Sequence, residues 1–130
     1  MISFSVNTGE RNRMIDITEM IDSRLGSLEN TSGFVFIFVP HTTCALTVNE
    51  NYDPDVSADI IEFLQKKIPE KGGYRHREGN SDAHIKAALI GTTLLLPYDE
   101  NKLSLGRWQG VFLCEFDGPR KRTIYLGQIS

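Results

Sequence analysis

The sequence predicts an α+β fold, a compact single domain with a β-sandwich-like sheet core and two or three helices. Strand-like segments recur along the chain, helix signals interrupt them, and no repeat, low-complexity tract or linker divides the 130 residues. A chain of this length can bury one hydrophobic core and is too short for two independent ones. We therefore expect residues 1–130 to form one domain.

The N-terminal segment predicts a hairpin followed by a short helix. Residues 2–6 alternate between apolar and polar side chains, residues 8–10 resemble a turn, and residues 13–16 suit a returning strand. Asp16 can then accept from the first backbone donors of a helix, with Glu19 three positions later as in a capping box. Gly26 is a plausible end for this helix.

The middle of the chain predicts two strands and the clearest helix. Residues 33–39 are apolar on both faces, which favours a strand buried from both sides, and residues 42–50 suit the next strand. Asp53 can cap a helix whose first position is Pro54. The expected buried stripe of this helix is Val56, Ile60, Phe63 and Leu64.

The C-terminal half predicts a loop, a short helix and three strands. Residues 71–78 are polar, after which Asn80 or Ser81 can cap a helix that ends at Gly91. The remaining strands are expected at residues 92–96, 111–116 and 122–129, separated by turn-like residues 97–101 and 117–119.

Composition excludes several classes of partner. The formal net charge of -3 gives no broad basic field for a nucleic-acid backbone, and no apolar stretch is long enough to span a bilayer. The N-terminus has no signal-peptide pattern, so we expect a cytoplasmic protein. Cys44 and Cys114 lie in apolar strand-like stretches and are expected to remain thiols there, with Cys44 a core residue rather than a nucleophile.

The three histidines form the first candidate site. His41, His76 and His84 fall after a strand, in a loop and in the first turn of a helix, which are positions where a scaffold presents side chains to a cleft. Three imidazoles can hold a divalent metal such as zinc and leave one position open. The alternative is three independent surface or core histidines, because no compact metal-binding spacing is present.

Polar side chains near the histidines add further candidates. Glu50 could orient a ligand or move a proton, Asn80 is a further candidate catalytic residue that also fits a capping role, and Asp53 could bind substrate or merely cap a helix. Glu50 shares a strand face with apolar neighbours, where a carboxylate needs a partner. Near the C-terminus, Glu115 could act in acid–base steps while Arg120 grips phosphate. Alternatively, these two residues form a salt bridge with each other.

Three separated motifs carry a resemblance to a known family. They are His41-Thr42-Thr43-Cys44-Ala45-Leu46-Thr47-Val48-Asn49-Glu50-Asn51 with Asp53-Pro54-Asp55-Val56, then Asn80-Ser81-Asp82-Ala83-His84-Ile85-Lys86, then Leu105-Gly106-Arg107-Trp108-Gln109 with Glu115-Phe116-Asp117-Gly118-Pro119-Arg120. In this order, over essentially the whole chain, they resemble the YjbQ-like family.

The resemblance implies a trimer with a pocket built from the motif residues, and a weak, secondary thiamine-phosphate synthase activity. That reaction joins hydroxymethylpyrimidine diphosphate to a thiazole phosphate and releases diphosphate. The site residues that the resemblance implies are His41, Glu50, His76, Asn80, His84, Gln109, Glu115 and Arg120. Two other functions fit the same residues, a metal-dependent hydrolase of a small phosphorylated substrate and a non-catalytic trimeric module that binds a phosphorylated metabolite.

Overall fold

The computed structural model describes residues 1–129. Its elements are β1 (Ile2–Asn7), β2 (Arg13–Asp16), α1 (Thr18–Leu25), β3 (Gly33–Phe38), β4 (Cys44–Glu50), α2 (Pro54–Lys67), α3 (Ser81–Ile90), β5 (Thr93–Asp99), β6 (Lys102–Leu103), β7 (Gln109–Glu115) and β8 (Lys121–Ile129). The α+β class predicted from the sequence is confirmed.

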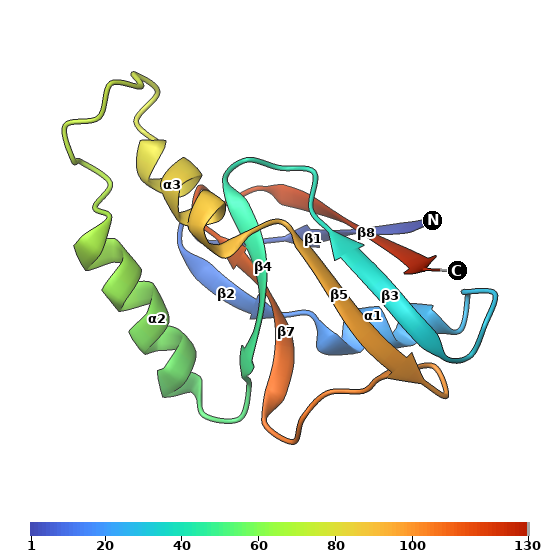
Figure 1. Ribbon diagram of the computed structural model, residues 1–130. Coiled ribbons are helices and arrows are strands. Elements are labelled where there is room, and N and C mark those ends of the chain that lie inside the picture. The colour runs from blue at the N-terminus through green and yellow to red at the C-terminus, as the bar shows by residue number, and fades with distance from the viewer. Residues whose placement is uncertain (130) are drawn as a thin grey trace.

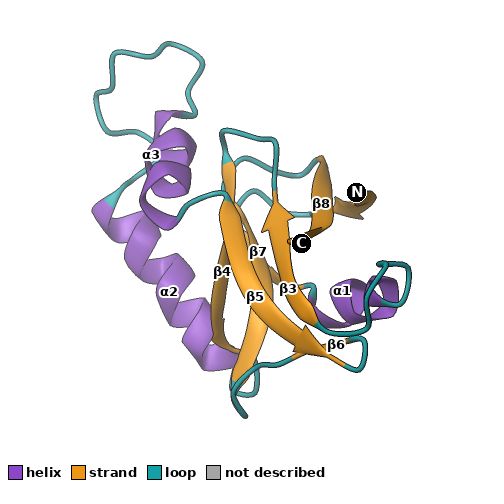
Figure 2. Cartoon of the chain, turned by 45° about the vertical axis from the view of Figure 1, so that its right-hand side comes forward, coloured by secondary structure: helices purple, strands orange, loops and turns teal. Residues whose placement is uncertain are grey.

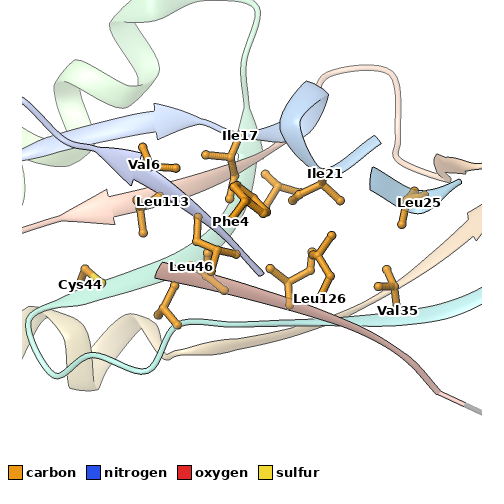
Figure 3. Close-up of a cluster of buried hydrophobic side chains, with 14 of the residues drawn as sticks. Phe4, Val6, Ile17, Ile21, Leu25, Val35, Cys44, Leu46, Leu113 and Leu126 are labelled. Carbon is orange, nitrogen blue, oxygen red and sulfur yellow. The ribbon is translucent and has the colours of Figure 1, made fainter. Parts of the chain in front are cut away.

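Two antiparallel sheets build the core (Figure 1). The larger has the order β1-β8-β3-β5-β6 and the smaller the order β2-β7-β4. Figure 3 shows Phe4, Leu46 and Leu126 meeting between the sheets, with Ile21 and Leu25 of α1 in the same cluster. Burial of this cluster from water is the main force that holds the two sheets together.

The N-terminal hairpin predicted from the sequence is wrong. β1 and β2 exist, but β1 pairs with β8 in the larger sheet and β2 pairs with β7 in the smaller one. The segment between them therefore crosses from one sheet to the other. Local alternation indicated each strand correctly and could not indicate its partner, because both partners lie about 100 residues further along the chain.

β3 is buried on one face only, which corrects the expectation of two buried faces. Val35 and Ile37 are fully buried, whereas Phe34 is 53% exposed on the outer face of the larger sheet. None of the helices in residues 1–129 covers this outer face, since α1 packs between the sheets and α2 and α3 lie beside the smaller sheet (Figure 2).

The helices begin and end close to the predicted positions. Asp53 caps α2 by accepting from the backbone N–H of Asp55 at 2.9 Å, and Pro54 occupies its first turn as expected. α1 starts after Ile17, and Asp16 accepts from the backbone N–H of Thr18 at 3.0 Å instead of forming a capping box with Glu19. The apolar stripe of α2 is not buried as expected, and Phe63 is 59% exposed.

α3 covers the outer face of the smaller sheet. Ala83 and Ala87 pack against Ala45, Phe112 and neighbouring residues in a second apolar cluster. Small side chains let the helix approach the sheet closely, which fixes the start of α3 near the ends of β4 and β7. None of the helices described in residues 1–129 has the length and apolar character needed to cross a membrane.

One turn lies later than predicted. Pro97 is part of β5, and the chain reverses at Glu100 and Asn101, both with positive φ, before the short strand β6 that the sequence did not predict. Two consecutive positive φ angles are typical of the tight turns that join twisted antiparallel strands.

Candidate functional site

A buried ion pair lies where β7 ends and β8 begins. Arg122 is 2% exposed and Glu115 is fully buried. The Arg122 Nε–H donates to Glu115 Oε1 at 2.8 Å, and its Nη2 donates to Oε2 of the same carboxylate. Such two-point contacts fix the relative orientation of both side chains.

The Glu115 carboxylate is saturated by further donors. Thr8 Oγ1 donates to Oε1 at 2.8 Å, and the backbone N–H groups of Phe116 and Asp117 donate to Oε2 at 3.0 and 3.1 Å. With no exposed surface and both oxygens occupied, Glu115 does not fit the predicted proton-transfer role. Its salt-bridge partner is Arg122 and not Arg120, which corrects that alternative as well. Glu115 holds the ends of β1, β7 and β8 together.

A second polar cluster joins the β7–β8 turn to the start of α3. Asp117 Oδ2 accepts from Arg120 Nη2 and from Asn80 Nδ2, both at 2.9 Å. Asp117 Oδ1 accepts from Arg11 at 3.2 Å. The structure thus brings together Asn80 and Arg120, two residues predicted from separate motifs, through a carboxylate that lies between them.

Arg11 extends this cluster to the buried face of α3. Its Nη2 donates to Asp82 Oδ1 at 3.0 Å, and Lys86 Nζ donates to Asp82 Oδ2 at 3.0 Å. Asp82 and Lys86 are almost completely buried. Lys86 therefore offsets the charge of Asp82, and Arg11 is shared among the carboxylates of Asp82, Asp117 and Glu70.

His76 and His84 lie together beside the first turn of α3. Their ring centroids are 5.4 Å apart with planes at 87°. They line a cavity of about 400 Å³, here called the α3 pocket, whose lining is Tyr74, Arg75, His76, Ser81, His84 and Ile85. The sequence predicted both histidines as site residues, and Arg75 and Ser81 were missed because nothing in a polar loop marks one arginine among several.

The start of α3 lacks the side-chain cap that the sequence predicted. The Asn80 side chain accepts no bond from the helix and donates to Asp117 instead. Its Oδ1 is buried without a hydrogen-bond partner in the described residues. Because no side chain caps α3, the partial positive charge of its N-terminus is available to a ligand in the α3 pocket.

His41 does not join the other two imidazoles in a metal site. Its Nε2 accepts from the backbone N–H of Thr123 at 3.0 Å, so this nitrogen is already occupied. Residues 1–129 contain no group of three or more His, Cys, Asp or Glu side chains placed to hold a metal ion. The predicted set of His41, His76 and His84 is therefore not assembled within one chain.

The buried surroundings of His41 make it a reporter of stability. Burial, and then the charge of Arg122, hold the pKa of His41 below its usual value of 6.5. As pH falls through this value, the unfolded chain takes up a proton before the folded chain does, so the free energy of unfolding decreases toward acid. We expect urea unfolding at pH 7.5 and 5.5 to show a smaller difference for His41→Gln than for the unchanged protein. An equal difference would contradict this assignment.

Three predicted site residues lie at the opposite end of the smaller sheet. Glu50 pairs in register with Gln109, whereas Cys44 at the other end of β4 pairs with Glu115. Six residues of strand span about 20 Å. Gln109 Oε1 accepts from the backbone N–H of Gly106 at 2.8 Å, and Asp53 caps α2, so both have local structural roles. One chain therefore does not combine these residues with the α3 pocket.

The two thiols are inert core groups, as expected. Cys44 and Cys114 are free and buried. They belong to different apolar clusters, on opposite faces of the smaller sheet. Burial raises the pKa of Cys44 to about 11 and that of Cys114 to about 12, so neither is a thiolate near neutral pH.

Arg122 is the principal residue that the sequence reading missed. The available signal was strand alternation, because Arg122, Ile124 and Leu126 share one face of β8 and all three are buried.

The comparisons with known proteins agree with this fold over its whole length. The family model described as UPF0047 protein YjbQ-like matches residues 2–130. The chain belongs to this family. Among curated relatives, a UPF0047 protein of Methanocaldococcus jannaschii is 44% identical over 97% of this chain and 91% of its own. The UPF0047 protein YugU of Bacillus subtilis is 42% identical, over 95% of each chain.

Solved structures of the YjbQ-like family confirm the architecture. An uncharacterised member from Clostridium acetobutylicum superposes with a TM-score of 0.94 at 43% identity, covering 99% of this chain and all of the other. A conserved hypothetical protein from Thermus thermophilus gives a TM-score of 0.92 at 42% identity, with the same coverage. These similarities establish family and fold, and leave the activity to be argued from the site.

Proposed function

We propose that this protein binds a phosphorylated small molecule in the α3 pocket and acts as a thiamine-phosphate synthase-type enzyme. It would join hydroxymethylpyrimidine diphosphate to a thiazole phosphate and release diphosphate. The observation that carries the proposal is the His76–His84 pair beside the uncapped start of α3, with Arg75 in the same pocket.

The charges around the α3 pocket favour an anion. Arg75 provides a permanent positive charge, the helix N-terminus a partial one, and the two imidazoles N–H donors. The exposed carboxylate of Glu78 lies 3.8 Å from His76 Nε2, and a bound anion would have to replace it there. The buried carboxylate of Asp82 in the first turn of α3 is paired with Lys86 and with Arg11. Arg120 is half-exposed, and its contact with Asp117 connects it to Asn80 at the start of α3. These groups suit the oxygens of a diphosphate.

The same groups would assist the departure of diphosphate. In the proposed reaction the thiazole nitrogen forms a bond to the pyrimidine methylene carbon, and the bond from that carbon to the diphosphate oxygen breaks. The departing oxygen keeps the electron pair and gains negative charge. Donors already placed around it, the imidazoles and Arg75, lower the barrier by stabilising that charge.

A metal ion is a separate question for this pocket. His76 and His84 supply two nitrogen donors, which is fewer than the three predicted from the sequence. The arrangement within one chain does not fit a three-histidine zinc centre, and the steps above therefore use only the protein's own groups.

The test is an assay with both phosphorylated precursors, run with magnesium, with zinc and with a chelator. Formation of thiamine phosphate with an equal amount of diphosphate supports the proposal. No product under any of these conditions would contradict it. Release of phosphate from one precursor alone would instead support the hydrolase, and tight binding without turnover the metabolite-binding module.

We also propose a homotrimer in the cytoplasm. The family resemblance supports the trimer, and the two free thiols fit a reducing compartment. Light scattering on the purified protein measures the assembly directly, and a monomer mass would contradict it.

A further inference from the structure

A second pocket lies at the far end of the smaller sheet from the α3 pocket. It has a volume of about 440 Å³, within the range of small-molecule sites, and is lined by Glu50, Tyr52, Asp53, Pro54 and Trp108. We call it the Trp108 pocket. It is separate from the pocket that carries the proposed function, and nothing in that function uses it.

Two aromatic rings form a corner in this pocket. The rings of Tyr52 and Trp108 are 5.3 Å apart at their centroids, with planes inclined at 69°. The Arg107 guanidinium lies over the Trp108 ring at 4.8 Å, so this indole already attracts a cation supplied by the protein itself. A cation is attracted to the free faces of these two rings, because the face of an aromatic ring is its electronegative part.

The carboxylates of the pocket are available to a ligand. Glu50 makes no side-chain hydrogen bond or ion pair in residues 1–129, although it is partly buried. Asp53 uses Oδ1 to cap α2, which satisfies the positive helix end that would otherwise attract an anion. Glu50 and Asp53 carry two negative charges and Arg107 carries one positive charge, so the net charge of the pocket is negative.

The backbone on either side of the pocket is held firmly. Glu50 and Gln109 are paired at the end of the β4–β7 ladder, and the backbone N–H of Asn51 donates to the Trp108 carbonyl at 3.0 Å. The segments that bear the carboxylate and the indole are thus fixed relative to each other before any ligand arrives. A preformed site loses less entropy on binding.

We propose that the Trp108 pocket binds an organic cation, a quaternary or protonated amine. The ligand packs against the aromatic corner and places its positive charge beside Glu50 and Asp53. Neutral molecules of the same shape lack the attraction to both the ring faces and the carboxylates. The proposal does not rest on the phosphate chemistry of the α3 pocket.

Trp108 is the only tryptophan of the chain, so its fluorescence reports on this pocket alone. The experiment titrates the protein with choline and, separately, with its neutral isostere 3,3-dimethylbutan-1-ol, at constant ionic strength. We expect a saturable change with choline and an affinity at least about fivefold weaker for the alcohol. An equal response to the two compounds, or no saturable response to choline, would overturn the proposal.

Two variants and a matched control complete the test. Glu50→Gln and Tyr52→Leu are each expected to weaken choline binding by about fivefold, and both leave the fold intact because neither side chain belongs to the core. Glu29→Gln removes an exposed carboxylate elsewhere on the surface and should leave the affinity unchanged. An equal loss with Glu29→Gln would indicate general charge attraction and overturn the assignment to this pocket.

Discussion

Glu115→Gln is expected to lower the free energy of unfolding by about 3 to 5 kcal/mol. The change leaves the Arg122 guanidinium fully buried without its countercharge. It also weakens the contacts that Thr8 and two backbone N–H groups make with the carboxylate. Urea unfolding followed by circular dichroism measures the difference.

Two further variants separate charge burial from general damage. Arg120→Gln breaks a pair in which the arginine is half-exposed, and should cost no more than about 1 kcal/mol. The double variant Glu115→Leu with Arg122→Met removes both buried charges, and should recover a large part of the loss seen in Glu115→Gln. A Glu115→Gln protein as stable as the Arg120→Gln protein would show that the buried pair is not what holds these strand ends.

Replacing both His76 and His84 by alanine is expected to weaken diphosphate binding by about 100-fold, roughly tenfold for each lost bond to a charged oxygen. Titration calorimetry with inorganic diphosphate at fixed ionic strength measures the affinity. The folded state should persist, because His76 is exposed and His84 only partly buried.

His41→Gln is the matched control for this effect. His41 is bonded to Thr123 and lies apart from the α3 pocket, so its replacement should leave diphosphate affinity unchanged. If His41→Gln weakened binding as strongly as the double variant, the anion would have to lie at the start of β4. The assignment to the α3 pocket would then be wrong.

The sequence predicted the elements of the fold well because their signals are local. The cap at Asp53, the first-turn Pro54 and the stop at Gly91 each act within a few residues. The pairing of β1 with β8 is not local, and no pattern near the N-terminus specifies it. The exposure of Phe34 and Phe63 could not be predicted from the sequence either, since hydrophobicity alone does not say which apolar faces are covered within one chain.

The sequence predicted which residue types form the site, and only partly which of these residues lie close together. His76, His84, Asn80 and Arg120 do gather around the start of α3, because the β7–β8 turn and the loop before α3 end at the same place. Glu50 and Gln109 lie elsewhere because β4 runs away from His41. The order of residues along the chain predicts which strand or helix carries each residue. The direction of a strand then decides at which end of the sheet that residue lies.

A crystal structure grown with diphosphate would show whether the α3 pocket is the anion site. We expect density for the anion against the first turn of α3, within hydrogen-bonding distance of His76 and His84, with Arg75 turned toward it. Diphosphate bound away from both histidines, or no diphosphate at a concentration that saturates the calorimetric titration, would contradict it.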